Sequence, residues 1–127
     1  MTAEKPVPID WGKWDVEING TPLAVDTASE LSVEDDEVAE ALARWHHTLA
    51  EAEYEACMVE AHYRAWAAEV GCQLLAKDGK LAEWKVRQSM HDHPSYRHYK
   101  EAIAMSRRNV TMVQGIVEGL RARTEMG

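Results

Sequence analysis

The densest group of potential ligand side chains is the run His91-Asp-His-Pro-Ser-Tyr-Arg-His98, where three imidazoles and a carboxylate could hold a zinc ion. The spacing does not support a zinc site, because no Cys pair and no His-Glu-x-x-His pattern organises the ligands. His46 and His47 are adjacent in an expected helix, where neighbouring side chains point about 100° apart, so they cannot share one ion. We therefore expect solvated or helix-capping histidines, and we predict no metal and no other cofactor.

Catalytic motifs are also missing from the chain. There is no Gly-x-Ser-x-Gly, no Gly-rich phosphate loop, and no Cys with an organised His and acid. Glu51, Glu53, Glu55 and Glu60 could suggest acid–base chemistry, but their spacing is typical of the solvated outer face of a helix. We predict that the protein is not an enzyme.

Positive charge is concentrated in one part of an acidic chain. The net charge is −8, yet residues 77–108 hold 8 basic and 4 acidic side chains, whereas residues 1–76 hold 4 basic and 16 acidic ones. Lys and Arg drive phosphate binding, and exposed rings beside a basic track hold single strands without sequence preference. Rings at Trp84, Tyr96 and Tyr99 interleave with this basic set, although a solvated helix face would explain the same residues. The basic set comprises Lys77, Lys80, Lys85, Arg87, Arg97, Lys100, Arg107 and Arg108.

Two heptad seams must position these side chains. Apolar residues alternate at spacings of four and three from Val38 to Val70, and again, with Ser106 at one position, from Tyr99 to Leu120. The pattern predicts an all-α fold, a long antiparallel helical hairpin with a short connecting helix. We expect the first helix to open at Ser32, to run to about Glu69 and to end at Gly71. The connecting helix is expected over residues 80–90, and the last helix from Pro94 to about Thr124.

The N-terminal part is expected to differ from the helical part. Alternating apolar residues on both sides of Asn19-Gly20 predict a small β-hairpin over residues 15–26. We divide the chain into residues 1–31, a tail with this β-hairpin, and residues 32–127, the helical hairpin domain. No apolar run is long enough to span a bilayer and the start does not resemble a secretory signal, so we expect a cytoplasmic protein with no membrane partner.

The last helix carries a second stripe beside its seam. In a two-helix hairpin this stripe has no partner within one chain, which predicts a homo-oligomer. The alternative is that the N-terminal hairpin and tail cover it within the monomer. The stripe consists of Ala102, Met105, Asn109, Met112 and Ile116, and continues to Gly119.

The order of these parts resembles the phage UvsY-type recombination mediators over residues 33–124. The resemblance rests on Ala-Arg-Trp to Tyr-Arg-x-Trp in residues 43–66 and on the Gly-Lys-Leu loop with its short basic helix in residues 79–87. It continues with Asp-x-Pro-x-Tyr and Tyr-Lys-Glu-Ala in residues 92–102 and with Val-Glu-Gly-Leu-Arg-Ala-Arg in residues 117–123. It is a match of helix order and pattern, without a single signature motif.

The resemblance implies a homo-oligomer that binds single-stranded DNA and helps to load a RecA-like recombinase. The family's basic positions late in the first long helix fall near His62 and Arg64, where His62 is a departure from a basic residue. Two other functions remain open. One is a phage virion or assembly scaffold protein without a DNA role, and the other is an acidic inhibitor of a host DNA-binding enzyme.

Overall fold

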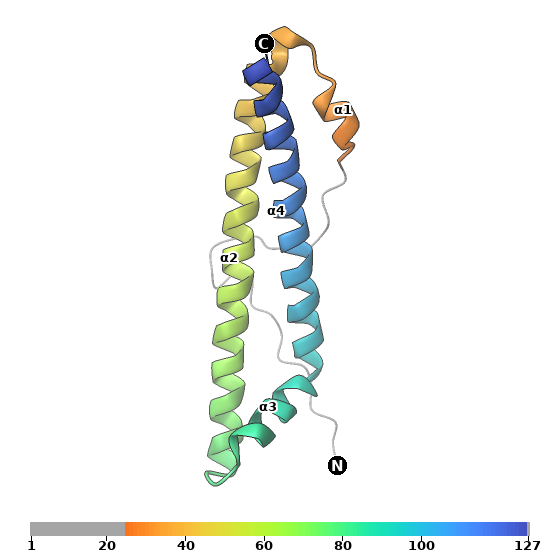
Figure 1. Ribbon diagram of the computed structural model, residues 1–127. Helices are drawn as coiled ribbons and strands as arrows, with labels where there is room; N and C mark the ends of the chain where they lie inside the picture. Colours follow the sequence, from red (N-terminus) through yellow and green to blue (C-terminus); the bar gives the residue numbers. More distant parts are fainter. Residues whose placement is uncertain (1–24, 127) are drawn as a thin grey trace.

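Two long helices lie side by side and form a rod (Figure 1). The computed structural model describes residues 25–126, and all elements in this range are helical. α2 and α4 run in opposite directions, and α3 connects them at one end of the rod. The predicted all-α helical hairpin with its connecting helix is therefore confirmed. The elements are α1 Thr27–Leu31, the 3-10 turn η2 Asp35–Glu37, α2 Val38–Lys77, α3 Glu83–His91 and α4 Pro94–Met126.

The predicted β-hairpin lies outside the described residues, except for its last two positions. Neither Val25 nor Asp26 is in a strand, and residues 25–126 contain no strand. Asp26 instead begins a helix, because its carboxylate accepts a hydrogen bond from the Ser29 amide at 3.3 Å and so caps α1.

The two predicted seams form the core between α2 and α4. Most seam positions are buried, and the others, such as Leu42 and Val110, are half-buried. Along the rod the core divides into three clusters. An aliphatic cluster lies near α1, a small pair lies in the middle, and a ring-rich cluster lies near α3. Their buried members are Ala41, Trp45, Val113, Ile116, Val117 and Leu120 in the first, Val59 and Ile103 in the second, and Trp66, Val70 and Tyr99 in the third.

The predicted end of the first long helix at Gly71 is wrong. α2 continues through this glycine to Lys77 and is 40 residues long, about 60 Å at 1.5 Å per residue. Val70 is buried and Leu74 packs against the ring-rich cluster, so tertiary packing on both sides outweighs the poor helix propensity of one glycine.

The predicted opening of that helix at Ser32 is also wrong. Ser32 ends α1 instead, and its hydroxyl donates to the Ala28 carbonyl at 2.6 Å. The chain then turns, and η2 and α2 follow with acidic residues in the first turn but without a side-chain cap.

The short helix α1 is held against α4 by polar and apolar contacts. The Arg123 guanidinium donates to the carbonyls of Leu31 and Val33 and lies 2.7 Å from a carboxylate oxygen of Asp35. Leu31 packs where Gly119 lacks a side chain, since a Cβ at Gly119 would come within 2.5 Å of the Leu31 Cδ2. Together with the core near α1, these contacts order the segment that precedes α2.

Pro94 opens α4 as predicted, and His93 caps it. The Ser95 amide donates to His93 Nδ1 at 3.1 Å, and the buried imidazole lies edge-on to Trp66. α3 begins three residues later than expected. Its half-buried positions are Val86 and Met90, whereas Trp84 is 63 % exposed.

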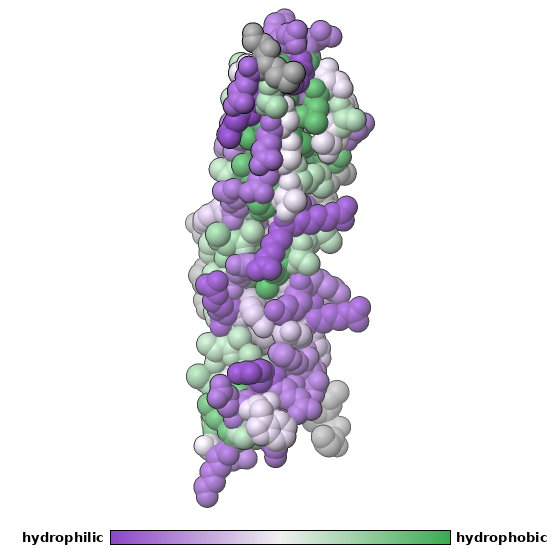
Figure 2. Space-filling view, viewed as in Figure 1, coloured by the Kyte–Doolittle hydropathy of each residue, from purple (hydrophilic) through white to green (hydrophobic). Residues whose placement is uncertain are grey.

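The face of the rod drawn in Figure 2 is largely hydrophilic. On the face drawn in Figure 2, polar side chains cover the middle of the rod, and hydrophobic surface shows beside α1 and towards the end of α2. Within residues 25–126, no helix has the length and apolar character needed to cross a bilayer.

Candidate nucleic-acid interface

The predicted basic residues converge most closely in an open groove between α2 and α4. The groove encloses about 320 Å³ and lies over the middle pair of the core. Three cations line it from two helices, and Ile103 and Ala104 supply apolar wall. We call this surface the cation groove; its polar lining consists of Glu60, Tyr63, Arg64, Lys100 and Arg107.

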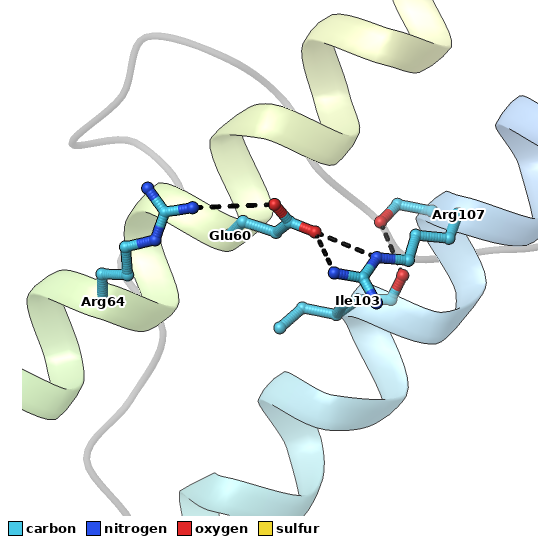
Figure 3. Close-up of polar contacts among 5 residues, drawn as sticks. Glu60, Arg64, Ile103 and Arg107 are labelled. Carbon is cyan, nitrogen blue, oxygen red and sulfur yellow. Dashed lines mark hydrogen bonds and ion pairs between the residues drawn. The ribbon is translucent and has the colours of Figure 1, made fainter.

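One carboxylate lies between two of these cations. Glu60 Oε1 accepts from Nε and Nη2 of Arg107 at 3.0 and 2.6 Å, and Glu60 Oε2 lies 3.8 Å from Arg64 (Figure 3). The bond to Arg107 crosses from α2 to α4, while Arg64 is one turn further along α2. Glu60 was expected on a solvated outer face, and this expectation is wrong because the residue lies at the helix interface.

The groove keeps positive charge after this pairing. Three cations face one carboxylate, and the side chains of Arg64 and Arg107 remain 77 % and 68 % exposed. Arg107 uses the Nε–Nη2 edge for Glu60, which is the edge that binds a carboxylate or phosphate in bidentate fashion. An incoming phosphate must therefore compete with Glu60 for Arg107, but not for Lys100.

Lys100 is positioned by aromatic rings. Its Nζ lies 4.9 Å from the centroid of Tyr63 and 5.5 Å from that of Tyr96. Such contacts fix the ammonium group while its hydrogen-bond donors stay available to a ligand. The groove thus combines a fixed ammonium and two guanidinium groups, which is the chemistry that binds the phosphates of a strand, while the Tyr63 ring is occupied by its contacts with Lys100 and Trp66.

His62 does not belong to this surface. It is only 7 % exposed, and its Nδ1 is hydrogen-bonded to the Tyr99 hydroxyl at 2.9 Å. Burial raises the pKa of Tyr99 to about 12, with a smaller contribution from the charge of Glu69. A buried imidazole that is bonded within the core is not placed to meet a phosphate, so the structure sets His62 apart from the cation groove.

A second basic group lies at the end of the rod formed by α3 and the turn that precedes it. Lys77, Lys80, Lys85 and Arg87 are exposed there. Arg87 forms an exposed i,i+4 pair with Glu83 at 3.3 Å. We call these four residues the tip cations.

The two remaining predicted contacts are on α4 and outside the groove lining. Arg97 pairs with Glu101 at 3.0 Å. Arg108 is exposed, next in sequence to Arg107. Of the ten predicted contacts, three therefore line the cation groove, four lie at the tip, two flank the groove on α4, and His62 is in the core.

Sequence reasoning missed Glu60 and Tyr63 as parts of the site. The i,i+4 spacing of Glu60 and Arg64 indicates a helical ion pair. The pairing of Glu60 with Arg107 across the groove depends on the register of α4 against α2. Two similar heptad seams could pack in registers that differ by whole heptads, so the sequence does not fix this pairing.

The histidines of the segment 91–98 make different contacts and do not form one site. His93 caps α4, and exposed His91 stacks on Tyr96 with ring centroids 4.6 Å apart. His46 and His47 are exposed on α2, as expected. Within residues 25–126, no three His, Cys, Asp or Glu side chains are grouped so that they could hold a metal ion.

The residues of the stripe predicted as an oligomer interface differ in how far they are buried. Ile116 belongs to the aliphatic cluster and Asn109 is buried, whereas Ala102, Met105 and Met112 are half-buried. The surface that this stripe leaves for a second copy is therefore limited to Ala102, Met105 and Met112. The homo-oligomer stays a prediction.

Comparison with known proteins gave no match among family models, curated sequences or solved structures. The resemblance over residues 33–124 accordingly stays a prediction, and function must be argued from the cation groove and the tip.

Proposed function

We propose that this protein binds single-stranded DNA through the cation groove and acts, as a homo-oligomer, as a recombination mediator that assists a RecA-like recombinase. The binding step is supported by one observation above all, the convergence of Arg64, Lys100 and Arg107 beside Tyr63 in an open groove. The mediator role is supported by the resemblance of helix order. No catalytic step is part of the proposal.

Glu60 makes a single groove a weak binding site. Its carboxylate holds the bidentate edge of Arg107, so each phosphate that binds there must replace an internal hydrogen-bonded pair. Several copies along one strand raise the overall affinity by effective concentration, without any new contact. This weakness is consistent with a protein that binds as an assembly.

The binding test compares two double variants that remove equal charge from different places. Arg64→Gln with Lys100→Gln neutralises the groove, and Arg44→Gln with Arg121→Gln neutralises two exposed cations elsewhere on α2 and α4. Fluorescence anisotropy measures affinity for a labelled thymidine oligonucleotide of about 20 nucleotides at several salt concentrations. The groove variant should lose at least about tenfold in affinity and about 1.4 units of the log–log salt slope, because each single-strand phosphate contact contributes about 0.7.

The control variant should change affinity much less, and circular dichroism should show both variants as helical as the unchanged protein. Equal losses in the two double variants would contradict the groove assignment. Absence of binding by the unchanged protein at low salt would exclude the DNA function altogether.

Glu60→Gln tests the competition directly. The substitution removes the negative charge that holds Arg107, so we expect tighter oligonucleotide binding by about 3- to 10-fold, which corresponds to the net free energy of one ordinary hydrogen bond, about 0.5–1.5 kcal/mol. Glu101→Gln is the matched control, because Glu101 pairs with Arg97 outside the groove lining.

A scaffold or assembly protein is the second candidate. It is favoured by exposed apolar side chains near the tip, namely Trp84 and the 45 % exposed Leu75. A scaffold would ignore the oligonucleotide at every salt concentration, so the same titration separates the two functions.

A further inference from the structure

The ring of Trp84 is the largest hydrophobic side chain left exposed in the described part of the chain. It is 63 % exposed in the first turn of α3, whereas Trp45 and Trp66 are 9 % and 3 % exposed in the core. Tryptophan is highly buried on average, and an exposed one is a common anchor for binding. The fold does not need this ring for its core, since α3 packs through Val86 and Met90.

Cations outnumber carboxylates near this ring, although the neighbouring Glu83 pairs with Arg87. Lys85 Nζ lies 5.6 Å from the Trp84 ring centroid, and the other tip cations lie on α3, in the preceding turn and at the last residue of α2. A nucleotide presents a flat π face and a phosphate a few ångströms apart. A ring with an ammonium group beside it matches both parts of one nucleotide.

A second exposed ring has the opposite surroundings. Tyr54 on α2 is 54 % exposed, and Glu51, Glu53 and Glu55 lie within three residues of it. Carboxylates repel the phosphates of a strand, so this ring is a poor partner for nucleic acid. Comparing Trp84 with Tyr54 therefore distinguishes the effect of an exposed ring from the effect of an exposed ring beside cations.

We infer that Trp84 stacks on an unpaired base at the tip and thereby selects single strands over duplex. The inference rests on the proposed function and extends it, because the cation groove supplies phosphate contacts that duplex DNA could also offer. Only an unpaired base can leave its own stack and lie against an exposed indole. The tip cations hold the neighbouring phosphates while the base stacks.

The experiment separates base contacts from phosphate contacts with three probes of equal length. They are a thymidine oligonucleotide, an abasic strand with the same phosphates, and a duplex. Dissociation constants are measured by fluorescence anisotropy for the unchanged protein, for Trp84→Ala and for Tyr54→Ala as the matched control. Trp84→Phe is added because a smaller ring should restore part of the stacking.

We expect Trp84→Ala to lose about 5- to 100-fold in affinity for the thymidine strand, the range of one base–aromatic stack. Its affinity for the abasic strand and the duplex should not change. Trp84→Phe should lie between the two, and Tyr54→Ala should match the unchanged protein on all three probes. Both substituted side chains are exposed, so the fold should persist, which circular dichroism verifies.

Three outcomes overturn the inference. Trp84→Ala could bind the thymidine strand unchanged, or could weaken the thymidine and abasic strands equally, in which case the ring makes no base contact. Alternatively, Trp84→Ala could alter the sedimentation of the protein without affecting the thymidine strand, which would make the ring a protein contact.

Failure of the proposed function gives a different result. In that case the unchanged protein binds none of the probes, or Arg64→Gln with Lys100→Gln leaves binding intact. The first result overturns the stacking inference as well. The second result leaves the stacking inference in place, because the effect of Trp84→Ala then concerns binding at the tip and not binding in the groove.

Discussion

The end of the rod that carries α1 and the end that carries α3 continue the same two seams with different side chains. Near α1 the core is mostly aliphatic, and polar groups such as Arg123 hold the neighbouring segment from outside it. Near α3 the core is rich in rings and includes the bonded pair of His62 and Tyr99. The comparison suggests that the first end mainly provides stability, while the second also positions the rings and cations above it.

Charge follows the same division. The acidic residues of η2 and the first turn of α2 lie near α1, and the tip cations lie at the other end. An elongated rod keeps the two groups tens of ångströms apart, further than the Debye length of about 8 Å at physiological salt. The acidic end therefore repels a strand only weakly from the basic end, although the whole chain is acidic.

The largest expected effect is loss of packing at the aliphatic end. Leu120 has no exposed surface, so Leu120→Ala removes buried groups and leaves a cavity, which should lower the free energy of unfolding by about 2–5 kcal/mol. Urea unfolding followed by circular dichroism measures the change. The exposed Leu75→Ala at the other end is the control and should stay within about 0.5 kcal/mol. Similar losses in both would contradict the division of roles.

Arg123→Ala should act only on the segment beside the aliphatic cluster. It removes donors to the Leu31 and Val33 carbonyls and the pair with Asp35, so α1 should open more easily by about 1–3 kcal/mol. Hydrogen exchange of the α1 amides should accelerate while the α3 end stays protected. Arg121→Ala, an exposed neighbour on α4, should change neither end. Faster exchange at both ends would show that they are coupled.

Tyr99→Phe should alter the pH dependence of stability at the ring-rich end. The pKa of Tyr99 is raised to about 12 in the folded protein, above an unfolded value of about 10. A group with a raised pKa contributes stability below its unfolded pKa, and this contribution is lost as the pH rises from 10 to 12. At pH 7 the free energy of unfolding of the variant should be lower by about 1 kcal/mol, because the hydrogen bond to His62 is missing. Above pH 10 the variant should lose less additional stability than the unchanged protein.

Thermal unfolding between pH 7 and pH 11.5 measures this difference. Tyr54→Phe is the control, because its ring is exposed and the substitution should leave the steep loss above pH 10 in place. Parallel curves for Tyr99→Phe and the unchanged protein would refute the assignment.

The smallest expected effect compares two glycines at opposite ends. At Gly71 a Cβ would meet nothing within 4 Å, so Gly71→Ala should stabilise the protein by up to about 1 kcal/mol through helix propensity. At Gly119 the added methyl group would collide with Leu31, so Gly119→Ala should lose this gain by displacing α1. Thermal unfolding and exchange at α1 distinguish the two. A gain of equal size at Gly119 would show that Leu31 yields without cost.

Local patterns in the sequence predict much of this fold. The seams predict which faces of α2 and α4 are buried, and Pro94 marks the start of α4. Gly71 misleads because its neighbours Val70 and Leu74 pack well enough to continue the helix. Ser32 misleads because Asp26 starts a separate helix before it.

The site was less accessible to prediction than the fold. The basic residues can be counted along the chain, but their grouping into groove and tip depends on how α4 is shifted along α2. His62 illustrates the limit, since its burial depends on Tyr99, a residue 37 positions away. Only the closeness of the tip cations, which are near one another in sequence, follows from the sequence directly.

The hairpin arrangement has a mechanical consequence. α2 begins and α4 ends at the same end of the rod (Figure 1), so tension applied between residues 38 and 125 pulls the helices apart like a zipper. Each layer of side chains then carries the load in turn, first the aliphatic layers, next the Glu60–Arg107 bridge and last the rings. Such a molecule opens at the force that one layer at a time can bear rather than at the sum of all of them.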